Sequence, residues 1–589
     1  MTSFPCRIGL FLCLCFYMTV RSYASDVPVI QVDKAIDIGD SVAVRILKTR
    51  LRERNLTFAP EKSNSVRFEL DSTLALDEYR ISLQNETIIL SASEKRGFVY
   101  AVGKLLRGTP QNGEFRYFGE TGTFSPKSPM RGVYFATHFG NFHESAPLSE
   151  VERYIEDMAL YGVNILVVWF DFHQYSGIDD PNALAMIERL HAMLRKANEV
   201  GMAGGLTLLA NEAYYTSPQE LRAEPFPHHY KVEICPSDPK GLDLICQWRA
   251  EMLDQFADLD IRYICVWPYD QGGCRCERCA PWGCNGFLKC AEAIARIVRE
   301  KLPQAKIFLS TWEFGYFYPD DLEWKGLYTQ LNERPDWIDG VLIEHHGDFP
   351  AFVLQNGPPK DYPIVNFPEI SMYAMSPWGG FGANLQCNRL IRVWNSAKTF
   401  LSGGFPYSEG IYEDINKFIC IQLYWSPDRS LDSILKEYVQ ANFGLLCEDD
   451  LKCVLAAIMQ LETQMAHSVN QQKLQIAKNL LQESNLSFSV DGNNPYPEVY
   501  KLGSDPSNMG EPLKLLANVS ERLPETVRKS WRWQVLWCRA VLDDELIKSG
   551  GRPTETSENC LKILSEIYHD NQVPDDVVPW IQVPRVGRK

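Results

Sequence analysis

Between residues 130 and 405 the chain alternates short apolar runs with longer stretches that have helical spacing. The apolar runs are 131–137, 164–170, 205–210, 263–268, 306–311, 340–343, 362–367 and 401–405. Apolar residues recur at helical spacing at 148–160, 183–200, 242–256, 287–302 and 388–397. Strands that alternate with helices form parallel βαβ units. Eight units over about three hundred residues have the count and size of a (β/α)8 barrel, so the pattern predicts a TIM barrel of the α/β class.

A small α/β domain is predicted before the barrel. Residues 27–32 indicate a strand and 40–54 a helix, and two alternating segments, 79–83 and 87–91, indicate a hairpin. An amphipathic helix follows over 92–106.

After Trp425 the spacing becomes helical throughout. The expected helices are 430–443, 449–468, 472–483, 511–520, 525–548 and 557–568. We therefore divide the chain into a signal peptide (1–25), an N-terminal α/β domain (26–125), a barrel (126–428) and a C-terminal helical domain (429–589).

The first residues have the pattern of an export signal. Arg7 supplies a positive charge, residues 8–20 are apolar, and 22–25 offer small residues for cleavage. A leucine precedes both Cys13 and Cys15, where a lipid-anchor signal would have a small residue. The apolar run is too short for a membrane span, and no later segment has a transmembrane pattern. We expect a cleaved signal and a secreted or periplasmic protein.

Composition narrows the function. The net charge is −16 and no basic stripe is present, so a nucleic acid is not an expected partner. Aromatic residues make up 12% of the chain, as suits a protein that binds sugar rings, although large cores use them too. No cofactor is indicated, and the oligomeric state stays open.

Acidic, aromatic and histidine residues follow the ends of the predicted strands, which is where a barrel carries its active site. The acids are Asp171, Glu212, Asp270, Glu313, Glu344 and Glu369. The neighbouring aromatic and histidine residues are His138, Trp169, His173, Tyr269, Trp282, Trp312 and His345. Glycoside hydrolysis needs two carboxyl groups whose environments separate their pKa values. We therefore predict a glycoside hydrolase that binds its carbohydrate substrate with these residues, while some of the rings belong to the barrel core.

Three segments resemble known glycoside hydrolases. The hairpin, Gly97 and the helix that ends at Leu106 resemble the small N-terminal domain of family 20 hexosaminidases and family 67 α-glucuronidases. Residues 128–132, Ser-Pro-Met-Arg-Gly, are similar to the first barrel unit of family 20, which implies that Arg131 binds the sugar. The spacing of Asp270 with three following cysteines is similar to enzymes of family 163.

The chain departs from family 20 at its acid. That family carries Asp-Glu after the fourth strand, whereas this chain has Asp270-Gln271, and glutamine cannot deliver a proton. Under acetamido-assisted catalysis the acid would be Glu313 or Glu344. The family 67 arrangement instead implies Asp270 as the acid, with Glu344 and Glu369 as the carboxylates that act on the catalytic water. We adopt that second assignment and keep Glu212 in reserve as a further catalytic candidate.

Two classes of substrate sugar, a uronic acid and an N-acetyl sugar, remain open. A uronic acid would need a positive pocket, for which Arg131, Arg275 and Lys289 are candidates, whereas an N-acetyl sugar would need an aromatic one. The activity is accordingly β-N-acetylhexosaminidase-like or α-glucuronidase-like, and exo-acting. The alternative is a non-catalytic carbohydrate-binding barrel, which the loss of the family 20 acid makes plausible.

A cluster of cysteines follows Asp270. The residues Cys274, Cys276, Cys279 and Cys284 have ligand-like spacing for a structural Zn²⁺. Export favours disulfides or free thiols, which is the interpretation we prefer. The adjacent His345 and His346 would point to opposite faces of a strand, so only one can line a pocket, as a partner of a sugar hydroxyl.

Overall fold

The computed structural model describes residues 29–33, 41–57, 65–138, 140–226, 230–270, 272–345, 347–359, 362–371, 383–466, 510–549 and 554–569. The predicted signal peptide, Gln271, His346 and the expected helix 472–483 lie outside the described residues.

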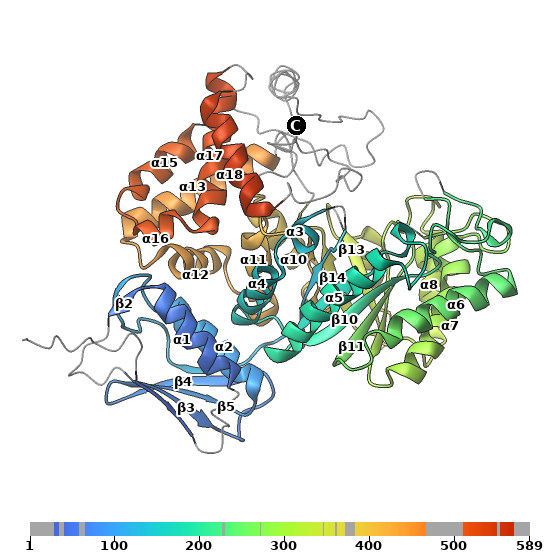
Figure 1. Cartoon of the computed structure of the whole chain (residues 1–589), viewed down its shortest axis with the longest axis horizontal. Helices are drawn as coiled ribbons and strands as arrows, with labels where there is room; N and C mark the ends of the chain where they lie inside the picture. Colours follow the sequence, from blue (N-terminus) through green and yellow to red (C-terminus); the bar gives the residue numbers. More distant parts are fainter. Residues whose placement is uncertain are drawn as a thin grey trace, which may run out of the picture.

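Eight parallel strands form the barrel, and each of the eight apolar runs overlaps one of them (Figure 1). The strands are β8 (Met130–Phe135), β9 (Ile165–Trp169), β10 (Ala203–Leu209), β11 (Ile261–Trp267), β12 (Lys306–Ser310), β13 (Gly340–His345), β14 (Ile364–Pro368) and β15 (Leu401–Gly404). Each pairs with the next, and β15 pairs with β8 to close the ring. A short strand, β16 (Tyr407–Ser408), extends the pairing with β8 toward the carboxyl ends. The predicted (β/α)8 barrel is confirmed.

Helices fill the connections between the strands. They are α3 (Phe142–Ser145), α4 (Leu148–Tyr161), α5 (Pro181–Glu199), α6 (Pro239–Asp254), α7 (Gly286–Lys301), α8 (Leu322–Asn332), α9 (Ala351–Asn356), α10 (Cys387–Ala397) and α11 (Asp414–Trp425). Pro181 and Pro239 occupy the first turn of α5 and α6, where the missing amide costs no hydrogen bond, and the preceding aspartates cap both helices. The connection from β13 to β14 carries only a short helix, because α9 has six residues.

The N-terminal part is a five-stranded sheet with two helices on one face (Figure 1). Its strand order is β1-β3-β5-β4-β7, formed by Val29–Val32, Ser65–Leu70, Thr87–Ala92, Tyr79–Gln84 and Gly122–Phe124. The helices are α1 (Val42–Glu53) and α2 (Lys95–Arg107), and a small pair, β2 (Leu56–Thr57) with β6 (Gly113–Glu114), lies apart. The predicted hairpin is β4–β5, whereas β3 was not predicted, although Ser65–Leu70 alternates polar with apolar residues as a half-buried strand does.

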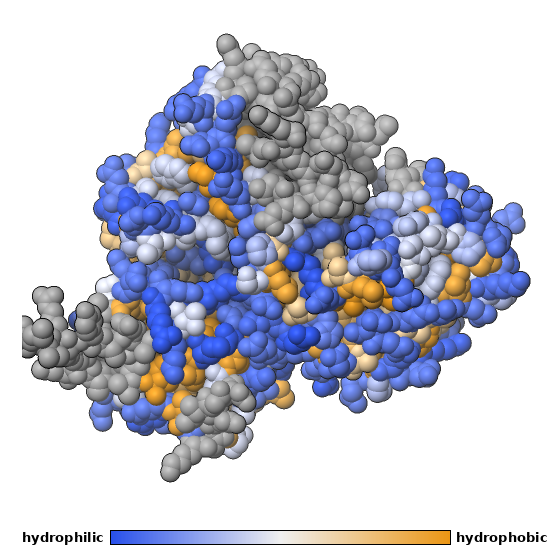
Figure 2. Space-filling view, in the orientation of Figure 1, coloured by the Kyte–Doolittle hydropathy of each residue, from blue (hydrophilic) through white to orange (hydrophobic). Residues whose placement is uncertain are grey.

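The C-terminal part is helical, as expected. It contains α12 (Leu431–Phe443), α13 (Glu448–Ala466), α15 (Glu511–Ser520), α16 (Glu525–Arg528), α17 (Trp531–Lys548) and α18 (Glu555–Tyr568). The expected helix 525–548 is split into α16 and α17, and the Ser530 hydroxyl accepts from the Trp533 amide at the start of α17. Among the described helices, none combines the length and apolarity needed to cross a bilayer. Figure 2 shows a largely hydrophilic face with hydrophobic residues gathered in a few places.

Arg131 joins the N-terminal sheet to the barrel. It lies near the start of β8, at the end of the strand opposite to the mouth, and its side chain is fully buried. The guanidinium donates to Asp77 Oδ2 at 3.0 Å, to Gly162 O at 3.0 Å and to Ser128 O at 2.9 Å. It also lies 5.0 Å from the centre of the Trp425 ring. The expectation that Arg131 binds the sugar is therefore wrong, because its donors are used inside the protein.

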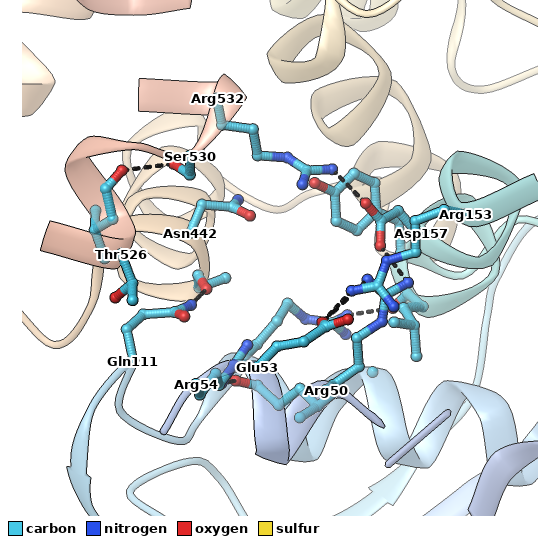
Figure 3. A pocket seen from close by; sticks show the side chains of 17 residues that line it. Arg50, Glu53, Arg54, Gln111, Arg153, Asp157, Asn442, Thr526, Ser530 and Arg532 are labelled. Carbon is cyan, nitrogen blue, oxygen red and sulfur yellow. Dashed lines mark hydrogen bonds and ion pairs between the residues drawn. The ribbon is translucent and has the colours of Figure 1, made fainter. Parts of the chain in front are cut away.

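A cavity of about 240 Å³ lies where the three parts meet (Figure 3). Asp157 of α4 lies at this junction. It forms ion pairs with Arg50 of α1 at 2.7 Å and with Arg532 of α17 at 2.8 Å. Both pairs are largely buried, so their geometry fixes the orientation of the helices more than exposed pairs would.

The buried pair Asp77–Arg131 should contribute strongly to stability. Replacement of Asp77 by Asn keeps its shape and leaves the Arg131 charge buried without its counter-ion, so we expect a loss of about 3 kcal/mol in the free energy of unfolding. Chemical denaturation measures this loss. The control is Glu69→Gln, which breaks the half-exposed pair with Arg67 and should cost less than about 1 kcal/mol. Equal losses in both variants would contradict the role given to Arg131.

Candidate active site

Aromatic side chains fill the barrel under its mouth. The ring of Trp267 lies 4.9 Å from Phe367, that of Tyr134 lies 5.4 Å from Tyr407, and Trp312 contacts the same group. All five rings are almost fully buried. These rings form an apolar layer, the aromatic floor, beneath the polar groups of the mouth. Trp312, which was expected to contact the sugar, packs within this floor.

Three carboxyl groups come together at the ends of three consecutive strands. Asp270 follows β11, Glu313 follows β12, and Glu344 is the penultimate residue of β13. The backbone amide of Asp270 donates to the Glu313 carboxylate. Burial, together with the charges of Asp270 and Glu344, raises the pKa of Glu313 to about 8. Glu313 therefore holds its proton at neutral pH.

The backbone at two of these three acids adopts an unfavourable conformation. Asp270 has a φ of 77° and Glu313 a φ of 59°, both in the left-handed region that non-glycine residues rarely adopt. Such conformations persist where the surrounding structure imposes them, and they cluster at functional sites. Glu344 is held differently, because it lies within β13 and its amide donates to Thr311 Oγ at 3.3 Å.

A second group consists of Asp171, His173 and Glu212, after β9 and β10. His173 Nδ1 pairs with Asp171 and lies 3.4 Å from Glu212 Oε1. Although burial opposes it, the charge of His173 lowers the pKa of Asp171 to about 2. Burial likewise opposes protonation of His173, but Asp171 and Glu212 raise its pKa to about 10. Burial and the Asp171 charge raise the pKa of Glu212 to about 8.

These three residues and their neighbours were expected at the mouth, and the structure brings them together. His138 lies beside this group, where burial lowers its pKa to about 4, and its ring contacts Trp169 at 4.8 Å. At neutral pH the group therefore contains a neutral imidazole, a protonated carboxyl, a carboxylate and an imidazolium. Such a mixture of donors and acceptors suits sugar hydroxyls.

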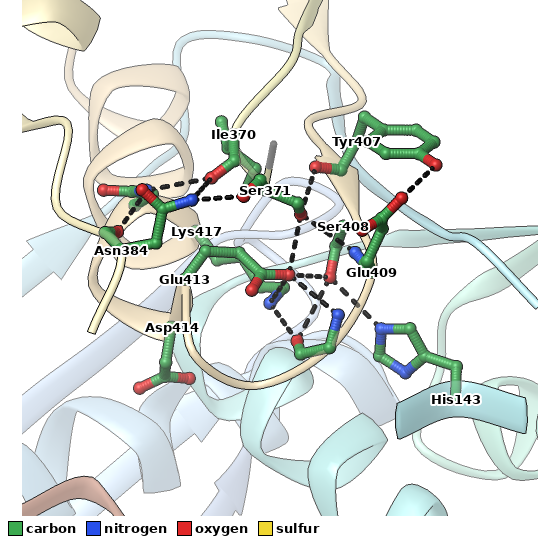
Figure 4. A network of polar contacts seen from close by, with 12 residues as sticks. His143, Ile370, Ser371, Asn384, Tyr407, Ser408, Glu409, Glu413, Asp414 and Lys417 are labelled. Atoms are coloured by element: carbon green, nitrogen blue, oxygen red, sulfur yellow. Dashed lines mark hydrogen bonds and ion pairs between the residues drawn. The ribbon is translucent and has the colours of Figure 1, made fainter. Parts of the chain in front are cut away.

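A third group surrounds Glu369 and Glu409, and Figure 4 shows the contacts around Glu409. Glu369 is fully buried and accepts from the Ser371 amide at 2.5 Å. Burial raises the pKa of Glu409 to about 8, with the charges of Glu369 and Glu413 adding to the shift. Tyr407 donates to Glu409 at 2.9 Å. The segment Tyr407-Ser-Glu409 directly follows the eighth apolar run, and that position is the signal by which Glu409 could have been selected as a site residue.

The residues under Glu409 form a dense network of hydrogen bonds. Glu413 Oε1 accepts from Ser371 Oγ at 2.9 Å, from Ser408 Oγ at 2.8 Å and from Lys417 Nζ at 3.1 Å (Figure 4). Ser371 Oγ in turn accepts from the Glu409 amide at 2.9 Å. Because Glu413 and Lys417 are both buried, this pair fixes the turn that carries Glu409.

Two expected sugar contacts belong to the core instead. Trp282 is fully buried, and its indole donates to Pro268 O at 2.5 Å. The Tyr269 hydroxyl donates to Glu323, a buried carboxylate that also accepts from the amide of Gly283 at 2.8 Å. Both predictions are wrong, because nearness in sequence to Asp270 does not place a side chain in the mouth.

His345 faces the outside of the barrel. Its Nε2 lies 2.7 Å from Asn366 Oδ1, and Asn366 in turn donates to the hydroxyl of Tyr424 on α11. Alternate residues of a strand point to opposite faces, so Glu344 takes the other side. The expectation that His345 contacts the substrate is therefore wrong.

Two groups among the described residues have ligand atoms close enough for a metal ion. They are Asp171 with His173 and Glu212, and Cys235 with Cys274, Cys276 and Cys279, each set lying within 4.8 Å. Cys284, which the spacing suggested as a ligand, is outside the second set, and its Sγ lies 3.8 Å from Pro281 O. Cys235 takes its place, from a loop that is distant in the sequence.

No family model matches the chain, and no curated protein matches it either. Solved structures do. A family 89 glycoside hydrolase from Clostridium perfringens, in complex with its substrate GlcNAc-α-1,4-galactose, aligns with a TM-score of 0.59 and 12% identity over 86% of this chain. This chain spans 61% of the length of that enzyme. A family 138 enzyme targeting pectin rhamnogalacturonan II aligns with a TM-score of 0.52 and 10% identity, over 92% of this chain and 74% of that one.

A family 20 β-N-acetylhexosaminidase from Streptomyces coelicolor aligns with a TM-score of 0.49 and 15% identity, over 70% of this chain and 90% of that one. The expected resemblance to glycoside hydrolases is confirmed for the fold. The resemblances to families 67 and 163 stay predictions.

The charge on His173 should make stability depend on pH. Its pKa is about 10 in the folded protein and about 6.5 when unfolded. Its pair with the ionised Asp171 thus stabilises the fold at about pH 6.5 and loses its effect as the pH rises through 10. The difference in melting temperature between wild type and His173→Gln should shrink over that range.

Thermal melts across that pH range measure the difference. The control is His191→Gln, whose partner Asp258 is exposed, and its smaller effect should change little. A His173→Gln difference that is constant over the range would contradict the charge assignment.

Proposed function

We propose that the protein is a glycoside hydrolase that cleaves O-glycosidic bonds at the barrel mouth. The observation that carries this proposal is the meeting of Asp270, Glu313 and Glu344 at the ends of three consecutive strands, where burial raises the pKa of Glu313 to about 8. A glycosidase needs one carboxylic acid to protonate the leaving oxygen and one carboxylate to attack or to activate water. The cluster supplies both kinds of group.

In this proposal Glu313 is the general acid. Its proton passes to the glycosidic oxygen as the bond breaks, and positive charge develops on the sugar ring. Glu344 is the nucleophile or the base for water, because β13 holds it rigidly. Asp270 adds the negative charge that keeps Glu313 protonated. This assignment replaces Asp270 as acid, and the other two expected catalytic residues, Glu369 and Glu212, have no role in it.

An N-acetylhexosamine is the sugar we favour. Of the three cations considered for a uronate pocket, Arg131 is buried at the far end of β8, Arg275 pairs with Glu224, and Lys289 is exposed on α7. A uronate carboxylate would also meet the acidic groups of the mouth. The substrate of the family 89 structure, a GlcNAc glycoside, is consistent with this choice.

We further propose that the enzyme is exo-acting and works outside the cytoplasm on extracellular oligosaccharides or polysaccharides. The export pattern of residues 1–25 supports the location. Removal of single terminal sugars from a defined oligosaccharide, followed by chromatography of the products, tests the exo mode.

Substitution of the acid should separate its role from that of the nucleophile. Glu313→Gln should lower kcat/KM by about 10²–10⁴-fold on glycosides with poor leaving groups. The loss should be much smaller on dinitrophenyl glycosides, which need no proton, whereas Glu344→Gln should slow both kinds of substrate. Initial rates on aryl glycosides of GlcNAc, GalNAc and glucuronic acid, in both anomers, measure this.

The control is Glu292→Gln, a half-exposed residue of α7 that pairs with Arg296, and it should keep full activity. Full activity in Glu313→Gln would refute the site. A wild-type chain that binds a glycan without hydrolysing any would instead favour the non-catalytic carbohydrate-binding barrel.

The rate should also fall on the alkaline side. Glu313 acts in its protonated form, so kcat/KM should decline as the pH rises through about 8. A pH profile on a substrate with a poor leaving group measures this limb. The limb should be absent from the residual activity of Glu313→Gln, and its persistence there would assign the titration to another group.

A further inference from the structure

Four cysteine sulfurs meet between two loops at the barrel mouth. Cys235 lies in the loop after β10, and Cys274, Cys276 and Cys279 lie in the loop after β11. Cys235 Sγ lies 3.7 Å from Cys274 Sγ, 3.9 Å from Cys276 Sγ and 3.9 Å from Cys279 Sγ. All four sulfurs lie within 4.8 Å of one another.

These distances fit a tetrahedron around one ion. A zinc–thiolate bond of about 2.3 Å gives a sulfur–sulfur edge of about 3.8 Å in a regular tetrahedron. Cys235 stands at that separation from each of the other three sulfurs. Disulfides would instead divide the four into pairs, each at about 2.05 Å. One sulfur at this distance from three others fits a shared ion and does not fit two disulfides.

We propose that Cys235, Cys274, Cys276 and Cys279 bind one zinc ion as four thiolates. Four protein ligands complete the coordination of zinc, so the site is structural and offers no open position to a substrate. Ser237 Oγ lies 3.0 Å from Cys279 Sγ, where its hydroxyl can donate to the thiolate and orient it.

The ion would fasten together the two loops that border Asp270. These loops already share Asn211, whose Oδ1 accepts from the Gly273 amide at 2.7 Å and whose Nδ2 donates to Ile234 O at 2.9 Å. Ile234 directly precedes Cys235, and Gly273 directly precedes Cys274. Zinc would thus extend a connection that begins three residues after Asp270 and would stabilise the strained backbone there.

Metal analysis of the full chain tests the proposal. Purified protein is reduced, supplied with zinc and freed of excess metal, and its zinc content is measured by mass spectrometry. We expect about one zinc per chain. Replacement by Co²⁺ should give the intense visible and near-ultraviolet bands of tetrahedral cobalt thiolate, a signature independent of activity.

Two serine variants provide the comparison. Cys276→Ser removes a half-buried ligand and should weaken zinc binding by more than the 10–100-fold that loss of an outer partner costs, roughly, at metal sites. Cys284→Ser changes a cysteine of the same loop outside the four and should keep wild-type zinc affinity. Competition with a chromogenic chelator measures both affinities.

Three results would overturn the proposal. They are a wild-type chain that retains no zinc after reduction and loading, an equal loss of affinity in Cys284→Ser and Cys276→Ser, and a thiol titration of the unreduced, unfolded protein that finds these four cysteines oxidised. Zinc content is measured without a substrate. Absence of glycosidase activity would therefore not contradict the zinc site, and absence of bound zinc would not contradict the proposed function of the acid cluster.

Discussion

Backbone pairing between β15 and β8 closes the barrel, and the position of every polar group at the mouth depends on it. Gly403 opposite Met130 and Gly404 opposite Arg131 form this last seam. The seam is tight, because Gly403 has a φ of 127° and a Cβ there would lie 1.7 Å from Met130 O. Only glycine allows the two strands to approach this closely. Once the ring is closed, the ends of strands far apart in the sequence face one another.

The closed ring explains why several acids at the mouth share an elevated pKa. The aromatic floor excludes water below them, and each carboxyl group also feels the charge of its neighbours. Glu212, Glu313 and Glu409 reach pKa values of about 8, each in a different group of residues. Asp171 stays ionised because His173 neutralises it. The mouth thus holds both protonated and ionised carboxyl groups at one pH, which is the condition for acid and base chemistry in a single site.

The flanking parts brace this ring from two sides. The N-terminal sheet reaches the base of β8 through Asp77 and Arg131, whereas α18 reaches the mouth, where the Tyr568 hydroxyl donates to Glu409 O at 2.9 Å. Asp157 links the two flanking parts across α4. The buried ion pairs of Asp77 and Asp157 lie at these junctions, where a wrong angle between the parts would leave a charge without its partner. The helical part therefore bears directly on one of the acid groups.

The sequence alone determined the barrel, because alternating strand and helix periods are local properties and the eight runs carry them clearly. It also determined that acids such as Asp270, Glu313 and Glu344 stand at strand ends, since the ends follow from the runs. Which way a side chain faces was decided by the tertiary structure: His345 turns outward, Trp282 enters the core and Arg131 stands at the wrong end of its strand. The same holds for Cys235, which is distant in sequence from the other three cysteines and meets them only because neighbouring strands place their loops side by side. Local periodicity reports what a segment forms, but contacts and pKa values depend on what packs around it.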